Sequence, residues 1–262
     1  MRTKALFRIF THRFSLSLGI LVLFAFPPVL FGQYVTFSDV SQSAGVAEPD
    51  SGTGHGVTFA DFNGDGLLDI YMVNWWNQPN FLFINNGDGT FTNRAGAYGV
   101  TVPLGSDRGV SAADFDNDGD MDFYVSSGGQ NYFFRNDNNQ GFTNITYAAG
   151  VIDWGEGMNV CFGDYDNDGN LDLLITNQGY GENQLFHNNG DGTFSKVTEQ
   201  AGLGDYRRSN GTAFFDYDND GYPDIFIARG TRDENYSGLL YHNNGNGTFT
   251  EVAGSAGVGV SG

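Results

Sequence analysis

The chain has 262 residues, 31 of them acidic and 12 basic, and its formal net charge is −19 at pH 7. This balance argues against nucleic acid or an anionic membrane surface as a partner, because both are bound by clusters of basic side chains. The single cysteine, Cys161, excludes a disulfide framework.

Residues 1–32 have the pattern of a secretory signal peptide. A basic start is followed by an apolar run from Leu16 to Phe26 and by Pro27 and Pro28. The apolar run is short for a membrane span, so a retained membrane anchor is the less favoured alternative. Cleavage near Gly32 leaves residues 33–262, and we expect this part to be secreted or otherwise extracytoplasmic (periplasmic, cell-surface or extracellular), without membrane insertion.

An aspartate-rich nonapeptide occurs four times after this leader. The copies DFNGDGLLD, DFDNDGDMD, DYDNDGNLD and DYDNDGYPD begin at Asp61, Asp114, Asp164 and Asp216. Their carboxylates lie at positions one, three, five and nine, except that Asn63 takes the third position of the first copy. The glycine at position six permits a sharp turn that brings the later groups back toward the first. Carboxylates this close repel one another unless a cation lies among them, and flexible oxygen ligation suits Ca²⁺.

The sequence therefore predicts about four Ca²⁺ sites. The side chains at positions one, three, five and nine and the backbone carbonyl at position seven are the expected ligands. These residues are Asp61, Asn63, Asp65, Leu67 and Asp69; Asp114, Asp116, Asp118, Asp120 and Asp122; Asp164, Asp166, Asp168, Asn170 and Asp172; and Asp216, Asp218, Asp220, Tyr222 and Asp224.

The loops match an EF-hand at positions one, three and five and at the glycine in position six, but position twelve argues against that motif. An EF-hand has a bidentate glutamate there, whereas these copies have Met72, Val125, Ile175 and Ile227. The residues after each loop alternate and are rich in β-branched and aromatic types, which indicates a strand. We therefore expect each loop to join two strands, which also disfavours tandem dockerin-like or thrombospondin-like calcium loops.

A second turn follows each loop. It reads NNGDGTF at 85–91 and 188–194, NDNNQGF at 136–142 and NNGNGTF at 243–249. The Asn-Gly and Asp-Gly pairs of the first, third and fourth copies are hairpin signals. The first unit then has expected strands at 57–60, 68–74, 81–84 and 90–94. Four antiparallel strands in about fifty residues, repeated, predict an all-β chain built as a β-propeller. The expected units are 47–99, 100–150, 151–202 and 203–257.

These repeats resemble the FG-GAP/VCBS repeat of integrin-alpha-type β-propellers and of secreted proteins similar to cartilage acidic protein. The resemblance implies a calcium-stabilised propeller, commonly of seven blades, that makes adhesive contacts with proteins or glycans. Only four units are visible, and the segment from Tyr34 to Val46 resembles a fourth strand without its preceding three. We therefore expect either missing C-terminal blades in a longer protein or a homo-oligomer that closes the ring.

The ligand face is expected opposite the calcium loops, where the connections differ between units. Trp75 and Trp76 are adjacent indoles that suit a sugar ring or a protein partner, although packing over the blade edge is the alternative. His55 and Arg108 occupy equivalent positions, six residues before the first metal aspartate of their loops. We expect them to contact the ligand or, as the alternative, to form a polar rim.

No catalytic constellation ties these residues together, so we expect a non-enzymatic interaction module. His187 and His242 precede hairpin Asn pairs and are interpreted as strand residues. The alternative is the N-terminal part of a secreted polysaccharide lyase-like enzyme on the same propeller, with catalytic groups partly beyond Gly262.

Overall fold

The computed structural model describes residues 36–47, 54–76, 78–102, 105–138, 140–179, 181–204, 208–229 and 238–259. The expected signal peptide, residues 1–32, lies outside this range. The chain divides into two compact units, Met1–Asp39 and Val40–Gly262, and the following description concerns the second. Within the described residues, the structure has no helix that is long and apolar enough to cross a membrane.

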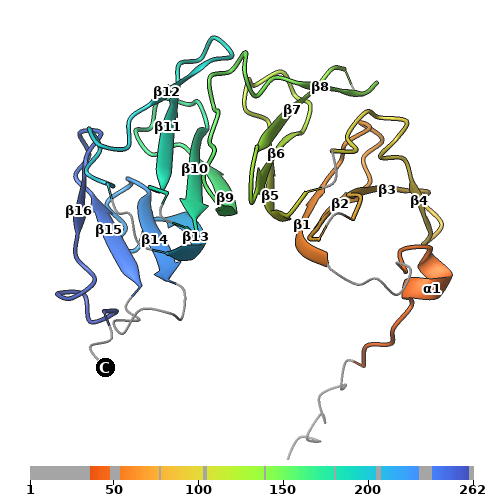
Figure 1. Cartoon of the computed structure of the whole chain (residues 1–262), viewed down its shortest axis with the longest axis horizontal. Coiled ribbons are helices and arrows are strands. Elements are labelled where there is room, and N and C mark those ends of the chain that lie inside the picture. Colours follow the sequence, from red (N-terminus) through yellow and green to blue (C-terminus); the bar gives the residue numbers. More distant parts are fainter. Residues whose placement is uncertain are drawn as a thin grey trace, which may run out of the picture. The chain divides into compact units, whose positions relative to one another are not determined.

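The second unit contains four antiparallel sheets, each with four strands in chain order (Figure 1). The strands of the first two sheets are β1 (Gly54–Ala60), β2 (Asp69–Asn74), β3 (Phe81–Asn85) and β4 (Phe91–Asn93), then β5 (Asp107–Ala113), β6 (Asp122–Ser127), β7 (Tyr132–Asn136) and β8 (Phe142–Asn144). Those of the last two are β9 (Gly157–Gly163), β10 (Asp172–Asn177), β11 (Gln184–Asn188) and β12 (Phe194–Lys196), then β13 (Ser209–Phe215), β14 (Asp224–Arg229), β15 (Leu239–Asn243) and β16 (Phe249–Glu251).

This arrangement confirms the all-β prediction and the four-stranded blades. In the first sheet the aspartate-rich loop joins β1 to β2, with Ala60 paired to Asp69, and the second turn joins β3 to β4, with Asn85 paired to Phe91. The tight loops require left-handed backbone at their fourth and sixth positions, as at Asn167 (φ 60°) and Gly169 (φ 90°). Asparagine and glycine tolerate this conformation best, which explains why the loop sequence is so restricted.

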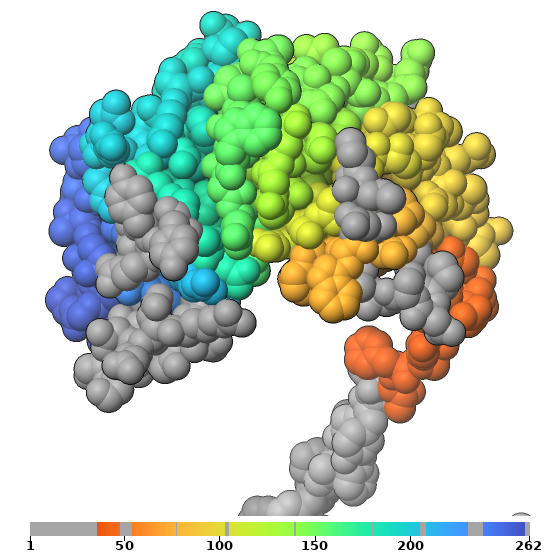
Figure 2. Space-filling model, viewed as in Figure 1, coloured from red at the N-terminus to blue at the C-terminus, as the bar shows by residue number. Residues whose placement is uncertain are grey.

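The hydrophobic core lies between consecutive sheets. The first strands β1, β5, β9 and β13 are neighbours in this order, and Figure 2 shows the sheets following one another from orange to blue. One buried cluster joins Phe62 and Tyr71 of the first sheet to Phe123 of the second, and the rings of Tyr71 and Phe123 are 4.3 Å apart. Two equivalent clusters join the second sheet to the third and the third to the fourth. Each sheet is therefore stabilised mainly by its neighbours.

A buried asparagine adds a polar link between neighbouring sheets. Asn188, the first residue of its hairpin turn, donates its side-chain N–H groups to the carbonyl of Phe115 in the preceding sheet (2.8 Å) and of Leu171 in its own (3.1 Å). Asn136 and Asn243 make the equivalent pairs of bonds. The hairpin asparagine thus also links neighbouring blades by hydrogen bonds, a role that the sequence did not predict.

The expectation of a strand within Tyr34–Val46 is wrong for the residues that the structure describes. Residues 36–40 have no strand, and a short helix α1 (Ser41–Ala44) follows, closed by Gly45 in the left-handed conformation. A β-strand needs a hydrogen-bonded neighbour, and the sheets contain no strand from this segment.

The outer faces of the first and last sheets remain accessible in the described part of the chain. Val57 and Phe59 of β1 are 52% and 58% exposed, and Phe215 of β13 is 41% exposed. The first strand of each sheet is its inner strand. In the two sheets between the first and the last, the inner strands β5 and β9 are packed on both sides by the inner strands of neighbouring sheets. The predictions of further blades or of a second chain remain predictions.

Candidate metal loops and binding pocket

Each aspartate-rich loop folds around its first carboxylate. In the third loop Asp164 accepts the N–H groups of Asp168 (3.0 Å) and Gly169 (2.9 Å), and the other three loops have the equivalent bonds. The seventh residue, Asn170, donates its N–H to Asp168 at 2.8 Å, as Leu67, Asp120 and Tyr222 do to their own fifth residues. The first five positions are thus drawn into one compact turn.

The ninth aspartate connects this turn to the sheet. Asp172 is fully buried and accepts the N–H of Tyr165 (3.1 Å) and the N–H of Asn188 (2.9 Å) at the end of β11. Asp69, Asp122 and Asp224 are equally buried and make the same two bonds in their own sheets. This side chain therefore has a structural role in addition to the metal role expected for it.

The carboxylates of these loops are electrostatically strained. Burial raises the pKa of Asp122 to about 8, against the lowering effect of its two N–H bonds. Burial and the neighbouring carboxylates also raise the pKa of Asp116 and of Asp166, and burial raises that of Asp172. A bound cation removes this penalty, because it favours the charged form of every carboxylate around it.

In the described residues the geometry brings three of the expected ligands together in each of the second, third and fourth loops. The carboxylate oxygens of Asp164, Asp166 and Asp168 lie within 4.8 Å of one another, as do those of their counterparts in the fourth loop, Asp216, Asp218 and Asp220. In the second loop Asp114, Asp116 and Asp122 form such a group. The first loop has three carboxylates, and the amide oxygen of Asn63 replaces the fourth, accepting the N–H of Asp65 at 3.0 Å. One buried oxygen, Oδ1 of Asp166, has no hydrogen-bond partner, so the donor set fits a hard divalent cation.

The structure adds two imidazoles that the sequence analysis assigned to strands only. His187 Nδ1 lies 3.3 Å from Asp166 Oδ2 and 3.2 Å from Asp172 Oδ1. His242 Nδ1 lies 3.3 Å from Asp218 Oδ2 and 3.4 Å from Asp224 Oδ1. The strand register could have predicted these contacts. Because Phe186 pairs with Leu173 in the antiparallel sheet, His187, the next residue on β11, lies beside Asp172 at the ninth loop position.

At the opposite end of the inner strands, the four residues expected on the binding face lie together. The rings of His55 and Trp75 meet edge to face at 5.2 Å, Arg108 lies over Trp75 at 5.8 Å, and Trp76 packs beside Trp75 at 5.3 Å. Trp76 is 67% exposed, whereas Trp75 is half-buried. Trp75 thus packs within the cluster, as the edge-packing alternative held, and Trp76 faces solvent.

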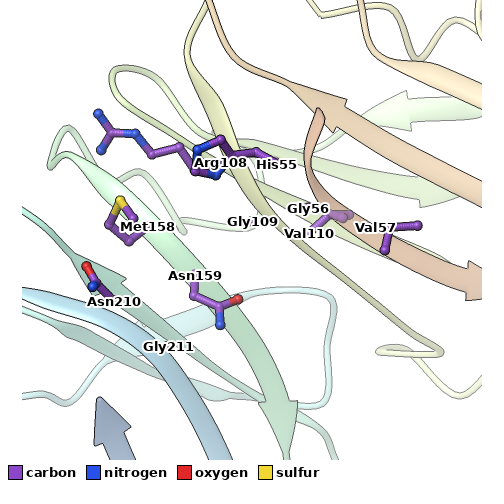
Figure 3. Close-up of a pocket in the computed structure, with 10 residues that line it drawn as sticks. All are labelled: His55, Gly56, Val57, Arg108, Gly109, Val110, Met158, Asn159, Asn210 and Gly211. Carbon is purple, nitrogen blue, oxygen red and sulfur yellow. The ribbon is translucent and has the colours of Figure 1, made fainter. Parts of the chain in front are cut away.

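This cluster borders a pocket of about 350 Å³ that opens where the four inner strands begin (Figure 3). The residues six before each metal loop, His55, Arg108, Met158 and Asn210, line it together with Asn159. The strands come very close there: a Cβ on Gly109 would lie 2.8 Å from Cα of Asn159. Glycine at that position therefore keeps the pocket narrow and lined by backbone as well as side chains.

Burial shifts the pKa of both titratable groups that line the pocket in the described residues. Burial and, secondarily, the charge of Arg108 lower the pKa of His55, which keeps the imidazole neutral at pH 7. Burial lowers the pKa of the Arg108 guanidinium, which the Glu156 carboxylate 4.0 Å away opposes. The Arg108 side chain is only 10% exposed, so this cation is held in a fixed position beside the pocket.

Comparison with known proteins gives a family and distant relatives. Residues 61–125, 114–175, 164–227 and 216–261 match the model of an FG-GAP-like repeat. The chain is 43% identical over 84 residues to human cartilage acidic protein 1, and these residues are 32% of this chain and 12% of that protein. The Xenopus tropicalis protein of that name is 38% identical over 96 residues, 35% of this chain and 14% of its own length.

Two solved structures are also similar. One is an Agrocybe aegerita lectin described as recognising non-reducing terminal N-acetylglucosamine, with a TM-score of 0.44 and 24% identity over 73% of this chain and 49% of the lectin. The other is the V. cholerae biofilm matrix protein Bap1, with a TM-score of 0.42 and 17% identity over 74% of this chain and 29% of that protein.

Proposed function

Because the chain belongs to the FG-GAP-like repeat family, we propose that it is an exported, calcium-stabilised β-propeller module that binds a glycan or protein ligand. One observation carries the proposal: the metal loops and the pocket bordered by His55, Trp75 and Arg108 lie at opposite ends of the same inner strands. The metal-loop end is nearly the same in all four sheets, whereas the pocket end has residues that differ from one sheet to the next.

Calcium has a structural role in this proposal. Carboxylates at positions one, three, five and nine hold the ion, with the carbonyl at position seven, and the ion neutralises buried negative charge. A ligand bound only to the folded state stabilises it by about 2.7 kcal/mol per site at a hundredfold excess over the dissociation constant. Sites of extracellular modules typically have dissociation constants of about 0.1 to 1 mM, which agrees with export.

The pocket has the chemistry of a carbohydrate site. Trp76 does not line the pocket but packs on Trp75 at its border, where its exposed indole offers a flat apolar face to a sugar ring. Asn159, Asn210 and backbone groups around the pocket offer both donors and acceptors to hydroxyl groups. The fixed cation of Arg108 favours a sugar that bears a carboxylate or sulfate. The volume falls within the usual range for small-ligand sites, about 300 to 1,000 Å³.

We propose binding without turnover as the primary activity. Lyase-like cleavage of a uronic-acid polysaccharide is the second candidate, favoured by the neutral His55 beside Arg108. In such a reaction the imidazole accepts the proton α to the carboxylate while the guanidinium neutralises that carboxylate. Against it, the pocket-lining residues that the structure describes include no Asp, Glu, Lys or Tyr, so among them only His55 could protonate the leaving group.

The test is a binding and turnover assay with neutral and acidic glycans on the calcium-loaded protein. Trp76→Ala and Arg108→Ala should weaken binding at least about tenfold, which corresponds to about 1.4 kcal/mol. Tyr147→Ala removes another exposed aromatic side chain that belongs neither to the pocket lining nor to the cluster of His55, Trp75, Trp76 and Arg108, and it should leave binding unchanged. Release of unsaturated sugars, abolished by His55→Gln, would instead support the lyase candidate. Equal binding by all variants would overturn the pocket assignment.

A further inference from the structure

The third and fourth metal loops differ from the first two in the residue that precedes the hairpin asparagine. His187 and His242 occupy this position in the third and fourth sheets, whereas Ile84 and Arg135 occupy it in the first and second. Arg135 is engaged elsewhere, because its guanidinium binds Asp137 at 2.9 Å. One chain therefore contains two loops with an imidazole beside them and two without.

Both imidazoles lie between the same two loop carboxylates. Nδ1 of His187 is almost equally far from Asp166 and Asp172, at 3.3 and 3.2 Å. The three ligand atoms lie within 4.8 Å of one another, and the equivalent group of His242, Asp218 and Asp224 does as well. Two sheets thus repeat one arrangement of one nitrogen and two oxygens.

These contacts are not hydrogen bonds. Nδ1 of His187 and Nδ1 of His242 are both buried atoms without a hydrogen-bond partner, and Oδ1 of Asp166 is another. In an imidazolium–carboxylate pair the N–H points at one oxygen. Here the nitrogen is aligned with neither carboxylate, which is the arrangement expected when a cation lies between the three groups.

The distances fit a small cation. Ligands bound at about 2.1 Å to Zn²⁺ or a similar ion are separated by about 3.0 to 3.4 Å for octahedral or tetrahedral geometry. The N–O separations of 3.2 to 3.4 Å lie in this range, and they also fit Ca²⁺, so the metal class follows from the nitrogen ligand rather than from the distance. An imidazole nitrogen is a poor ligand for Ca²⁺, which takes oxygen, but a good one for Zn²⁺, Mn²⁺, Co²⁺ and Ni²⁺.

We propose that the third and fourth sheets each bind a nitrogen-accepting divalent transition-metal ion, of the Zn²⁺ class, through His187, Asp166 and Asp172 and through His242, Asp218 and Asp224. The first two loops remain oxygen-only sites of the calcium class. This inference rests on the proposed function in one respect, because Asp166, Asp172, Asp218 and Asp224 are also ligands of the proposed calcium loops. In the third and fourth loops the transition-metal ion therefore competes with Ca²⁺ for these carboxylates.

The probe is Co²⁺, titrated into the full-length protein in millimolar calcium and followed by calorimetry and by visible absorption. The expected stoichiometry is two Co²⁺ per chain, falling to one in His187→Gln or His242→Gln and to none in the double variant. His55→Gln is the matched control, since this third described histidine lies beside Trp75, and it should still bind two. Arg135→His should add a third ion, because Asp116 and Asp122 already lie together there.

Two outcomes overturn the proposal: no stoichiometric Co²⁺ binding by the wild-type chain, or unchanged binding by the double variant. Glutamine preserves size and polarity, and the thermal unfolding of each variant in calcium verifies its fold. The same measurement separates the two proposals. If the double variant loses Co²⁺ binding but keeps its calcium-dependent stability, both proposals are supported. If the wild-type protein binds Co²⁺ but gains no stability from calcium, only the structural role of calcium is refuted.

Discussion

Removal of the hairpin asparagine should cost more stability in the third sheet than in the first. Asn188 and Asn85 have the same local bonds: each side-chain oxygen accepts the N–H two residues on (3.0 Å), and each amide donates to a carbonyl just before β10 or β2 (3.1 Å). Only Asn188 also reaches the preceding sheet, where it donates to Phe115 at 2.8 Å. The pair therefore compares a buried asparagine that bonds to the preceding sheet with a half-buried one that does not.

The magnitude follows from the buried carbonyl that the substitution leaves unpaired. Leaving such a group without a partner costs about 1 to 3 kcal/mol, so Asn188→Ala should lower the free energy of unfolding by that much more than Asn85→Ala. In a folded unit the size of Val40–Gly262, each kcal/mol corresponds to about 2 to 4 °C in the melting temperature.

The assay is urea-induced unfolding of both variants in saturating calcium, followed by circular dichroism and by tryptophan fluorescence. Coincident transitions by the two probes justify the comparison of free energies. Equal losses in Asn188→Ala and Asn85→Ala would refute the account of the asparagine as a link between neighbouring blades. Asn243→Ala provides a replicate, because Asn243 also bonds to the preceding sheet, at Tyr165.

Three further predictions concern charge and metal. Asp118→Ala should lower the melting temperature in calcium and change it little in chelator, because this exposed ligand contributes mainly through the ion; equal losses in both media would remove it from the ligand set. Replacing Asp107, whose pKa burial raises to about 6, by Asn should stabilise the protein at pH 7 by about 1 to 3 kcal/mol. Between about pH 4 and pH 6 the folded state keeps the Asp107 proton while the unfolded state releases it, so the free energy of unfolding of the wild type should fall as the pH rises through that window. Urea titrations should show that the free energy of unfolding of Asp107→Asn depends less on pH. In chelator, the raised pKa of Asp122 should likewise make the protein more stable at pH 6 than at pH 8; the opposite slope by thermal unfolding would contradict it.

The repeated architecture could be predicted from the sequence because its signals are local. The spacing of Asp114, Asp116 and Asp118 around Gly119 specifies a turn, and the alternating residues after it specify a strand. The pocket was partly predictable for a similar reason. His55 and Arg108 stand at the same distance before their loops, so neighbouring strands place them side by side.

The remaining features depend on contacts between segments far apart in the chain. The bond from Asn188 to Phe115 spans 73 residues, and nothing in the local pattern of a hairpin asparagine indicates it. The position of Arg108 over Trp75 depends on how two sheets pack. The absence of a strand in residues 36–40 has the same cause, because a strand-like sequence forms a strand only where a neighbour offers hydrogen bonds.

Thermal unfolding of the protein in millimolar calcium and in excess chelator tests the central claim most directly. The account predicts a melting temperature that rises with the logarithm of free calcium once the sites begin to fill, since each filled loop relieves the repulsion among its carboxylates. A melting temperature that is the same in calcium and in chelator would contradict the claim that calcium bound at these loops stabilises the fold.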